Sequence, residues 1–270
     1  VGAGKVHDGR KVPFIAVPTT AGTGSEATRN AVLSRVGPGG FKKSIRLDAF
    51  VPDIAVVDPE LALSCPPDVT AACGMDAFTQ LLEAYVSVKS SPMTDALAWS
   101  GMERAKDVLV EAYRNGDRSV DSRAGMAYAA LMSGIALANA GLGVVHGFAS
   151  GIGGLFPIPH GVVCGVLLGP ATRITIGVLR DMGPEGVPAL EKYARVGRLV
   201  ADAPEAGTDE ACGFLLECLA KWRDALKLPR FGSCGVSRVD FDAVIAKSGS
   251  GNNPVKLEKG DMMKVLEDAI

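Results

Sequence analysis

The sequence predicts an α/β segment over residues 1–62, followed by a mainly helical domain over residues 63–270. Short apolar runs bounded by proline and glycine occupy the first part, as is typical of strands joined by turns. After Pro66 the apolar residues recur at three- and four-residue spacing, the period of a helix with one buried face. The 270 residues are 47% hydrophobic, which is enough to build a large core.

A strand and a polar loop are expected near the start. Residues 13–18, Pro-Phe-Ile-Ala-Val-Pro, form a short apolar run between prolines and predict a buried strand. Residues 19–26, Thr-Thr-Ala-Gly-Thr-Gly-Ser-Glu, follow at once. Glycines in such a loop expose backbone N–H groups and let a ligand approach closely. The loop is therefore a candidate site for a polar ligand.

Further strands are expected within residues 30–57, around the Gly-Pro-Gly-Gly turn at 37–40. The helical period then predicts helices over residues 69–86, 93–113, 123–140 and 190–201, within a remainder that is mainly helical. Thr94 and Asp121 are candidate N-caps for two of these helices, and Gly141 is expected to end the third.

Composition limits the possible partners. The formal net charge is -2, and the basic residues are scattered, so neither nucleic acid nor an anionic membrane surface is expected as a partner. No segment approaches 18 consecutive apolar residues, and the start lacks a signal-peptide pattern. The six cysteines form no C-x-x-C pair and lie in apolar stretches, which predicts buried free thiols and a cytoplasmic protein. The charge pattern favours small molecules as partners.

Three residues are unusual in their apolar surroundings. His146 and His160 share the glycine-rich segment 145–161, where a buried imidazole must satisfy both ring nitrogens, so either core hydrogen bonds or a shared metal would explain them. Asp76 lies within an expected helix, and Gln80 lies four residues later on the same face. The carboxylate of Asp76 needs a partner if it is buried; a half-exposed helix-end interaction is the alternative.

Five short strings occur in an order similar to that of the iron-containing (group III) alcohol dehydrogenases. They are the loop at 19–26, Asp-Pro-Glu-Leu at 58–61, Gly-Met-Asp-Ala at 74–77, Asn-Ala-Gly-Leu-Gly at 139–143 with His146-Gly147, and Pro-His-Gly at 159–161. The Asn-Asn-Pro at 252–254 also resembles the family's C-terminal segment. Together these strings identify the chain as a member of that family along essentially its whole length.

The resemblance implies a fold and a set of site residues. Residues 1–62 would be the C-terminal part, or remnant, of a Rossmann-like nucleotide-binding domain, and residues 63–270 an all-helical metal and substrate domain. The implied metal ligands are Asp76, Gln80, His146 and His160. Of these, Asp76, His146 and His160 would also be catalytic through the metal. The residues implied to lie beside the nicotinamide cofactor are Thr19, Thr20, Gly22, Thr23, Ser25 and Lys43.

Three departures from the family pattern qualify these expectations. Gln80 stands where a histidine ligand is usual, which implies a subgroup of the family with Gln at one metal-ligand position. An amide oxygen is the weaker donor, so weaker metal occupancy is expected. Ser150 stands where many members have a second histidine near the nicotinamide, so a proton relay would run through water, Ser150 or the cofactor ribose. The family's Gly-Gly-Gly-Ser pyrophosphate loop is expected upstream of Thr19 and has no match, so weak NAD binding is expected.

The resulting prediction is an NAD- or NADP-dependent alcohol dehydrogenase that converts an alcohol reversibly to an aldehyde or ketone, with Fe²⁺ or Zn²⁺ polarising the substrate oxygen. A homodimer or larger homo-oligomer is expected. Two alternatives stay open: a metal-free NAD(P)H-dependent carbonyl reductase similar to the maleylacetate reductases, and a non-catalytic fragment that acts through subunit association.

Overall fold

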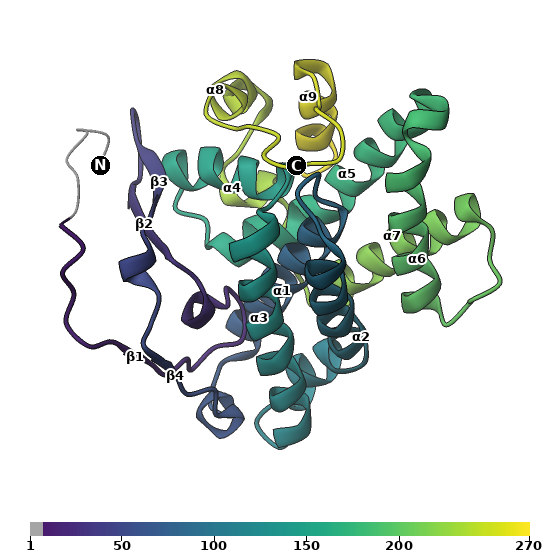
Figure 1. Ribbon diagram of the computed structural model, residues 1–270. Helices are drawn as coiled ribbons and strands as arrows, with labels where there is room; N and C mark the ends of the chain where they lie inside the picture. The colour runs from purple at the N-terminus through teal and green to yellow at the C-terminus, as the bar shows by residue number, and fades with distance from the viewer. Residues whose placement is uncertain (1–7) are drawn as a thin grey trace.

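The computed structural model describes residues 8–270 and shows a helical body with a β-containing segment along one side (Figure 1). Within the described residues, β-strands lie before residue 56 and α-helices from residue 67 onward, which confirms the predicted fold class. The predicted domain boundary at residue 62 coincides with the end of a 3₁₀ turn, η3 (Pro59–Ala62), and stays a prediction. Residues 1–7 lie outside the described region.

The β segment consists of two small pairs of strands. Strand β1 (Ile15–Ala16) pairs in parallel with β4 (Ile54–Ala55), and β2 (Asn30–Arg35) pairs antiparallel with β3 (Phe41–Arg46). The second pair is a hairpin whose turn contains Gly37 at φ 121° and Gly39 at φ 70°. Backbone of that kind favours glycine, which explains the Gly-Pro-Gly-Gly turn.

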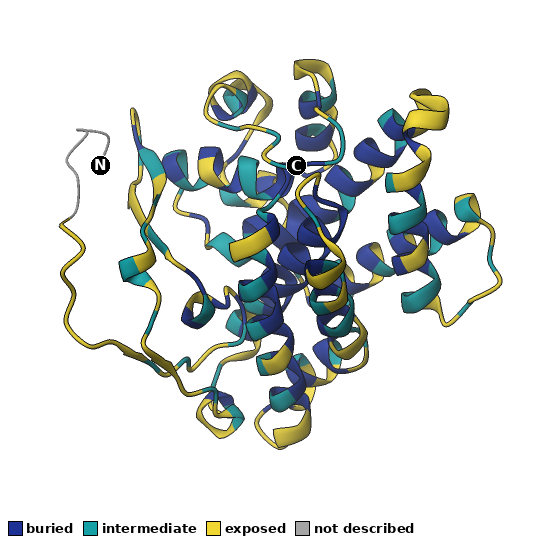
Figure 2. Ribbon diagram, viewed as in Figure 1, coloured by how far each residue is buried: buried dark blue, intermediate teal, exposed yellow. Residues whose placement is uncertain are grey.

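A strand is present within residues 13–18, as predicted, but its predicted burial was wrong. Ile15 is 58% exposed and its partner Ile54 is 53% exposed, and Figure 2 shows exposed residues along this strand. In the described part of the chain β1 hydrogen-bonds to β4 alone. An apolar run shows that a strand can be buried, but the strand is buried only where other elements pack on it.

The predicted helices are present, and each begins earlier than expected. The bounds of the α-helices are α1 (Pro67–Val86), α2 (Pro92–Asn115), α3 (Val120–Ala140), α4 (Val144–Leu155), α5 (His160–Asp181), α6 (Val187–Ala201), α7 (Thr208–Ala225), α8 (Phe241–Ala246) and α9 (Lys259–Glu267). The N-caps of α2 and α3 are Ser91 and Ser119 rather than Thr94 and Asp121. Thr94 instead completes a capping box, because its hydroxyl accepts the backbone N–H of Ser91.

Helix α1 runs through the centre of the helical body (Figure 1). Every residue from 74 to 86 is buried, and α1 packs against α2, α3 and α5. Phe78 of this helix meets Trp222 of α7 edge to face, with ring centroids 4.7 Å apart. A helix buried on all sides must pair its polar side chains inside the protein, which applies to Asp76, Gln80 and Glu83.

Helix α5 is the one described helix that is long and apolar enough to cross a membrane. Of its most apolar window, 67% is buried within the protein, where it packs against α1, α4, α7 and α9. A core helix has the same composition, so α5 gives little support to a membrane span. The predicted cytoplasmic location stays a prediction.

Candidate metal centre

Asp76 projects from the buried helix α1 and is 2% exposed. Its predicted location in a helix is confirmed, and the alternative of a half-exposed carboxylate is excluded by this burial. Gln80 and Glu83 follow one and two turns later, so the three polar side chains lie along one side of the helix. The histidines that pair with the carboxylates of Asp76 and Glu83 lie on α4 and α5.

The break between α3 and α4 positions His146. Gly141 ends α3 at φ 68°, and α4 starts at Val144 with its axis bent by 98° from that of α3. His146 therefore lies in the first turn of α4. Its Nδ1 lies 2.7 Å from Glu83 Oε2, while Glu83 Oε1 accepts the backbone N–H of Val145 at 2.7 Å.

The prolines before α5 place His160 as the first residue of that helix, after the N-cap Pro159. A proline there ends the preceding extended segment and leaves the next residue free to start a helix. Cys164 follows four residues later, one turn along the same face, and is fully buried.

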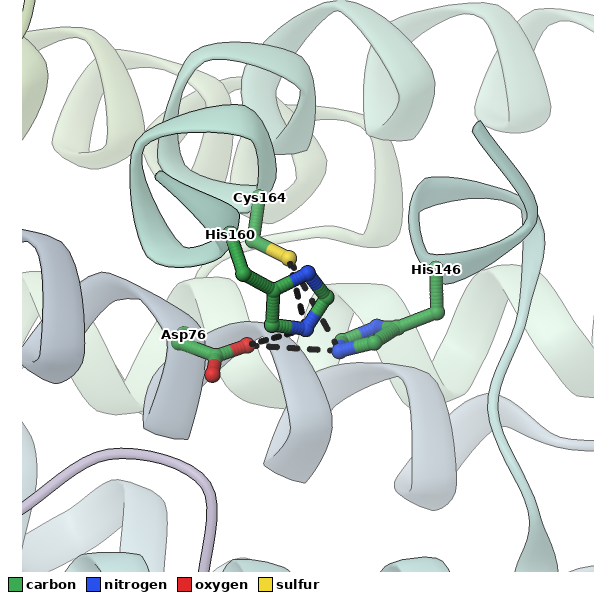
Figure 3. A group of neighbouring side chains, drawn as sticks. All are labelled: Asp76, His146, His160 and Cys164. Atoms are coloured by element: carbon green, nitrogen blue, oxygen red, sulfur yellow. Dashed lines mark hydrogen bonds and ion pairs between the residues drawn. The ribbon is translucent and has the colours of Figure 1, made fainter. Parts of the chain in front are cut away.

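These elements bring four side chains together, and Figure 3 shows them pointing toward one another. One ligand atom from each of Asp76, His146, His160 and Cys164 lies within 4.8 Å of the others. Asp76 Oδ1 is 3.3 Å from His146 Nε2 and 3.7 Å from His160 Nε2. Cys164 Sγ is 3.7 Å and 3.9 Å from the same two nitrogens.

The spacing and the chemistry of this group suit a metal ion. At metal distances of about 2.0–2.1 Å for nitrogen and oxygen and about 2.3 Å for sulfur, a tetrahedral ion separates its ligand atoms by about 3.3–3.6 Å. Four of the six separations, at 3.3–3.9 Å, are close to these values, and all six are within 4.8 Å. Glu83 also supplies the outer carboxylate that orients a ligating histidine, since it holds Nδ1 and leaves Nε2 facing the cluster.

Burial and the neighbouring charges shift the pKa values of the cluster in different directions. Burial alone would raise the pKa of Asp76, but His160 and His146 lower it to about 2. Burial lowers the pKa of His160 to about 4, against the opposing effect of Asp76. Burial would also lower the pKa of His146, but Cys164, Asp76 and Glu83 raise it above its usual value. A cation is thus favoured between Asp76 and Glu83, where a metal would replace the proton of His146.

A cleft of about 660 Å³ opens beside the cluster, with His146, His160 and Gln80 in its wall. Of the predicted cofactor residues, Thr23 and Ser25 line this cleft, and their hydroxyls are 2.7 Å apart. Ser150 also lines it, and its hydroxyl donates to the carbonyl of His146 at 3.3 Å.

The remaining predicted cofactor residues lie outside the lining of the cleft. Thr20 borders a separate small hollow, and Gly22 is buried against Cys73, where a Cβ would lie only 2.9 Å from the Cys73 Cβ. Thr19 is exposed beside them. Gly22 therefore serves the packing of the loop, and the cofactor roles of these residues stay predictions.

Lysine 43 was predicted to lie close to the cofactor, but its neighbour Lys42 occupies the cleft. Lys42, Ser44 and Arg46 alternate along β3 and line the cleft, so Lys43 lies on the opposite face of the strand. Lys42 Nζ lies 2.9 Å from His160 Nδ1, and burial lowers the pKa of this lysine.

Close backbone contact fixes the polar loop on α3. Gly24 has φ +59°, and a Cβ on Gly134 of α3 would lie 2.1 Å from the carbonyl oxygen of Gly24. Only glycine at both positions permits this approach. The contact helps to place Thr23 and Ser25 in the lining of the cleft, to which β3 contributes Lys42.

Cys164, Glu83 and Lys42 were missed as site residues in the sequence. The spacing of His160 and Cys164 by four residues, and that of Asp76 and Glu83 by seven, are signals of a shared helix face. The signal was weak because cysteine and charged residues at these spacings are also common in ordinary helices.

Comparison with known proteins identifies the family. Residues 70–270 match the model of the Fe-containing alcohol dehydrogenase family, C-terminal, and residues 1–59 match that of iron-containing alcohol dehydrogenase. The chain belongs to the iron-containing alcohol dehydrogenase family.

Similar proteins of known activity are dehydrogenases. The chain is 37% identical over 233 residues to 1-propanol dehydrogenase of Salmonella typhimurium, a match that covers 86% of the chain and 60% of that protein. It is 31% identical over 270 residues to NADPH-dependent butanol dehydrogenase of Clostridium saccharobutylicum, which covers 95% of the chain and 65% of that protein. The chain thus spans about three fifths to two thirds of the length of these relatives.

Solved structures agree with this assignment. A 1,3-propanediol oxidoreductase superposes with a TM-score of 0.86 at 32% identity, over 96% of this chain and 66% of that one. An alcohol dehydrogenase from Oenococcus oeni gives a TM-score of 0.84 at 32% identity, with the same coverage.

Proposed function

We propose that this chain carries the metal and substrate site of an NAD(P)-dependent alcohol dehydrogenase, which interconverts an alcohol with its aldehyde or ketone. The observation that carries the proposal is the convergence of Asp76, His146 and His160 beside the cleft. The family relationship supports it, because similar proteins include NADPH-dependent and NAD-dependent alcohol dehydrogenases. Gln80, predicted as a ligand, lines the same cleft.

The donor set fits a divalent metal, Fe²⁺ or Zn²⁺, held by the Asp76 carboxylate and the Nε2 atoms of both histidines. Such an ion, when bound, supplies the positive charge that stabilises negative charge on the substrate oxygen. Glu83 keeps His146 in the orientation and tautomer that leave Nε2 free.

The cleft residues of the chain have separate tasks in this proposal. Thr23 and Ser25 offer hydroxyls at the rim that can bind the polar groups of a nicotinamide cofactor. Ser150 stands where many family members have a histidine, and it lines the cleft, so the alcohol proton would leave through its hydroxyl, through water or through the cofactor ribose. Subunit association into a homodimer or larger oligomer stays a prediction.

The test is reduction of short-chain aldehydes, followed as NADH or NADPH oxidation, by the chain reconstituted with Fe²⁺ or Zn²⁺ under anaerobic conditions. We expect turnover that a chelator abolishes and added metal restores, and that is absent in Asp76→Asn and His160→Ala. Turnover that survives complete metal removal would instead favour the metal-free carbonyl reductase. Absence of turnover at saturating cofactor, together with no thermal stabilisation by either nucleotide, would reject the proposal in favour of the non-catalytic fragment.

A further inference from the structure

We infer that Cys164 is the fourth ligand of the metal centre in place of Gln80, and that this ligand set shifts the preference of the site from iron toward zinc. The inference rests on the proposed metal-assisted function. It assigns a role to a buried thiol that the proposed reaction does not otherwise use.

The thiol of Cys164 has its polar contacts inside the cluster. Its Sγ is 3.7 Å from His146 Nε2 and 3.9 Å from His160 Nε2, the two nitrogens that also face Asp76. A tetrahedral ion bound by imidazole and thiolate separates nitrogen from sulfur by about 3.5–3.6 Å. The distances from Cys164 Sγ to both nitrogens are therefore within a few tenths of an ångström of the values that tetrahedral coordination requires.

The amide of Gln80 has a partner of its own. Gln80 Oε1 lies 3.2 Å from the hydroxyl of Ser133 on α3, and Ser133 also contacts the carbonyl of Ala130 at 2.7 Å. Gln80 is 2% exposed, so a metal would compete for this oxygen with the Ser133 hydroxyl, whose single hydrogen the Ala130 carbonyl also accepts. A neutral amide oxygen is also a poorer ligand than a thiolate for a borderline-soft ion.

The position of Cys164 also explains how the helix can present two ligands. Residues 160 and 164 are one turn apart on α5, so His160 and Cys164 point to the same side (Figure 3). Asp76 and His146 approach from α1 and α4, so the four side chains enter the cluster from three helices. Two imidazoles, one carboxylate and one thiolate form a donor set that is compatible with tetrahedral zinc.

Cobalt spectroscopy of the chain tests the assignment. Co²⁺ is loaded into the purified, metal-stripped chain and into Cys164→Ser, Gln80→Ala and Cys218→Ser. We expect a near-ultraviolet charge-transfer band from thiolate to cobalt in the unsubstituted chain. The band should persist in Gln80→Ala and in Cys218→Ser, which controls for thiol removal elsewhere, and should disappear in Cys164→Ser.

Zinc affinity gives a second measure that does not depend on activity. Cys164→Ser should weaken zinc binding by more than the roughly 10- to 100-fold typical of losing an outer-shell partner, whereas Gln80→Ala should change it much less. When zinc and Fe²⁺ are offered together without oxygen, the bound zinc-to-iron ratio should fall in Cys164→Ser. A thermal melt of each variant, with Cys164→Ala as a second substitution, shows that the metal-free fold is retained.

The outcomes separate this inference from the proposed function. Cobalt bound through His160, and lost in His160→Ala, but without a thiolate band would overturn the role of Cys164 and leave the metal-assisted function standing. An unchanged zinc-to-iron ratio in Cys164→Ser would also overturn it. Failure of the unsubstituted chain to bind cobalt or zinc at all would overturn both.

Discussion

Glu83 lies outside the proposed ligand set, yet its substitution should weaken metal binding. Its two carboxylate oxygens accept the backbone N–H of Val145 and the Nδ1–H of His146, each at 2.7 Å, and its side chain is almost completely buried. A carboxylate in this position fixes the ring of His146 and raises the basicity of Nε2. Glu83 is thus a positioning residue for the cluster.

The substitution Glu83→Gln keeps the size of the side chain but only one acceptor oxygen. Its amide nitrogen would face either the N–H of Val145 or the Nδ1–H of His146, so one buried donor would be left without an acceptor. An unsatisfied buried donor costs about 1–3 kcal/mol of folding free energy. Loss of an outer-shell partner weakens metal binding by about 10- to 100-fold, which corresponds to about 1.4–2.7 kcal/mol of binding free energy.

Zinc affinity is measured by competition with a chromogenic chelator, alongside thermal unfolding of the metal-free protein. The matched control is Glu205→Gln, which removes a carboxylate at an exposed position and should change neither quantity. A folded Glu83→Gln variant that binds zinc within twofold of the unsubstituted chain would refute the reasoning, because His146 would then need no anchor or would not be a ligand.

Two further predictions concern stability. Arg123 is buried and donates hydrogen bonds to the hydroxyl of Thr70 and to the carbonyls of Cys65 and Gly116, so Arg123→Met should lower the free energy of unfolding by about 3–5 kcal/mol in urea titrations. A loss below about 1 kcal/mol, the size expected for the exposed control Arg114→Met, would contradict this. Burial raises the pKa of Glu26, so the folded state retains a proton that the unfolded state releases. The free energy of unfolding therefore falls as the pH rises from the pKa of the unfolded state through the raised pKa of the folded state. Glu26→Gln should therefore raise Tm more at pH 8 than at pH 5; an equal shift at both values would show that charge is not the cause.

Helix periodicity was sufficient to predict the helix that carries Asp76, but not its burial on all sides. That helix is apolar over several turns, and Asp76, which lies two residues after Gly74, is an acidic residue within this apolar sequence. The family strings then associated Asp76 with His146 and His160, and the structure places these three side chains together. Local pattern and order along the chain therefore contained most of the candidate site.

The misses have physical reasons that a single sequence conceals. Cys164 was classed with the apolar residues because a buried free cysteine usually behaves as one, and only the fold reveals that its thiol meets two imidazoles. Lys42 and Lys43 differ only in the face of β3 that they occupy, and a shift of one residue in a strand exchanges those faces. The first and last residues of β3 could not be predicted from the sequence, so the sequence could not show which of the two lysines faces the cleft.

Charge balance gives an independent reason for the composition of the cluster. His146 and His160 lie at the starts of α4 and α5, where helix N-termini carry partial positive charge that disfavours a cation. Asp76 alone would leave a bound divalent ion with one excess positive charge among its ligands, and the neutral amide of Gln80 would not change that sum. A thiolate at Cys164 makes the sum zero, and Glu83 then offsets the partial positive charge of the helix ends from outside the ligand set.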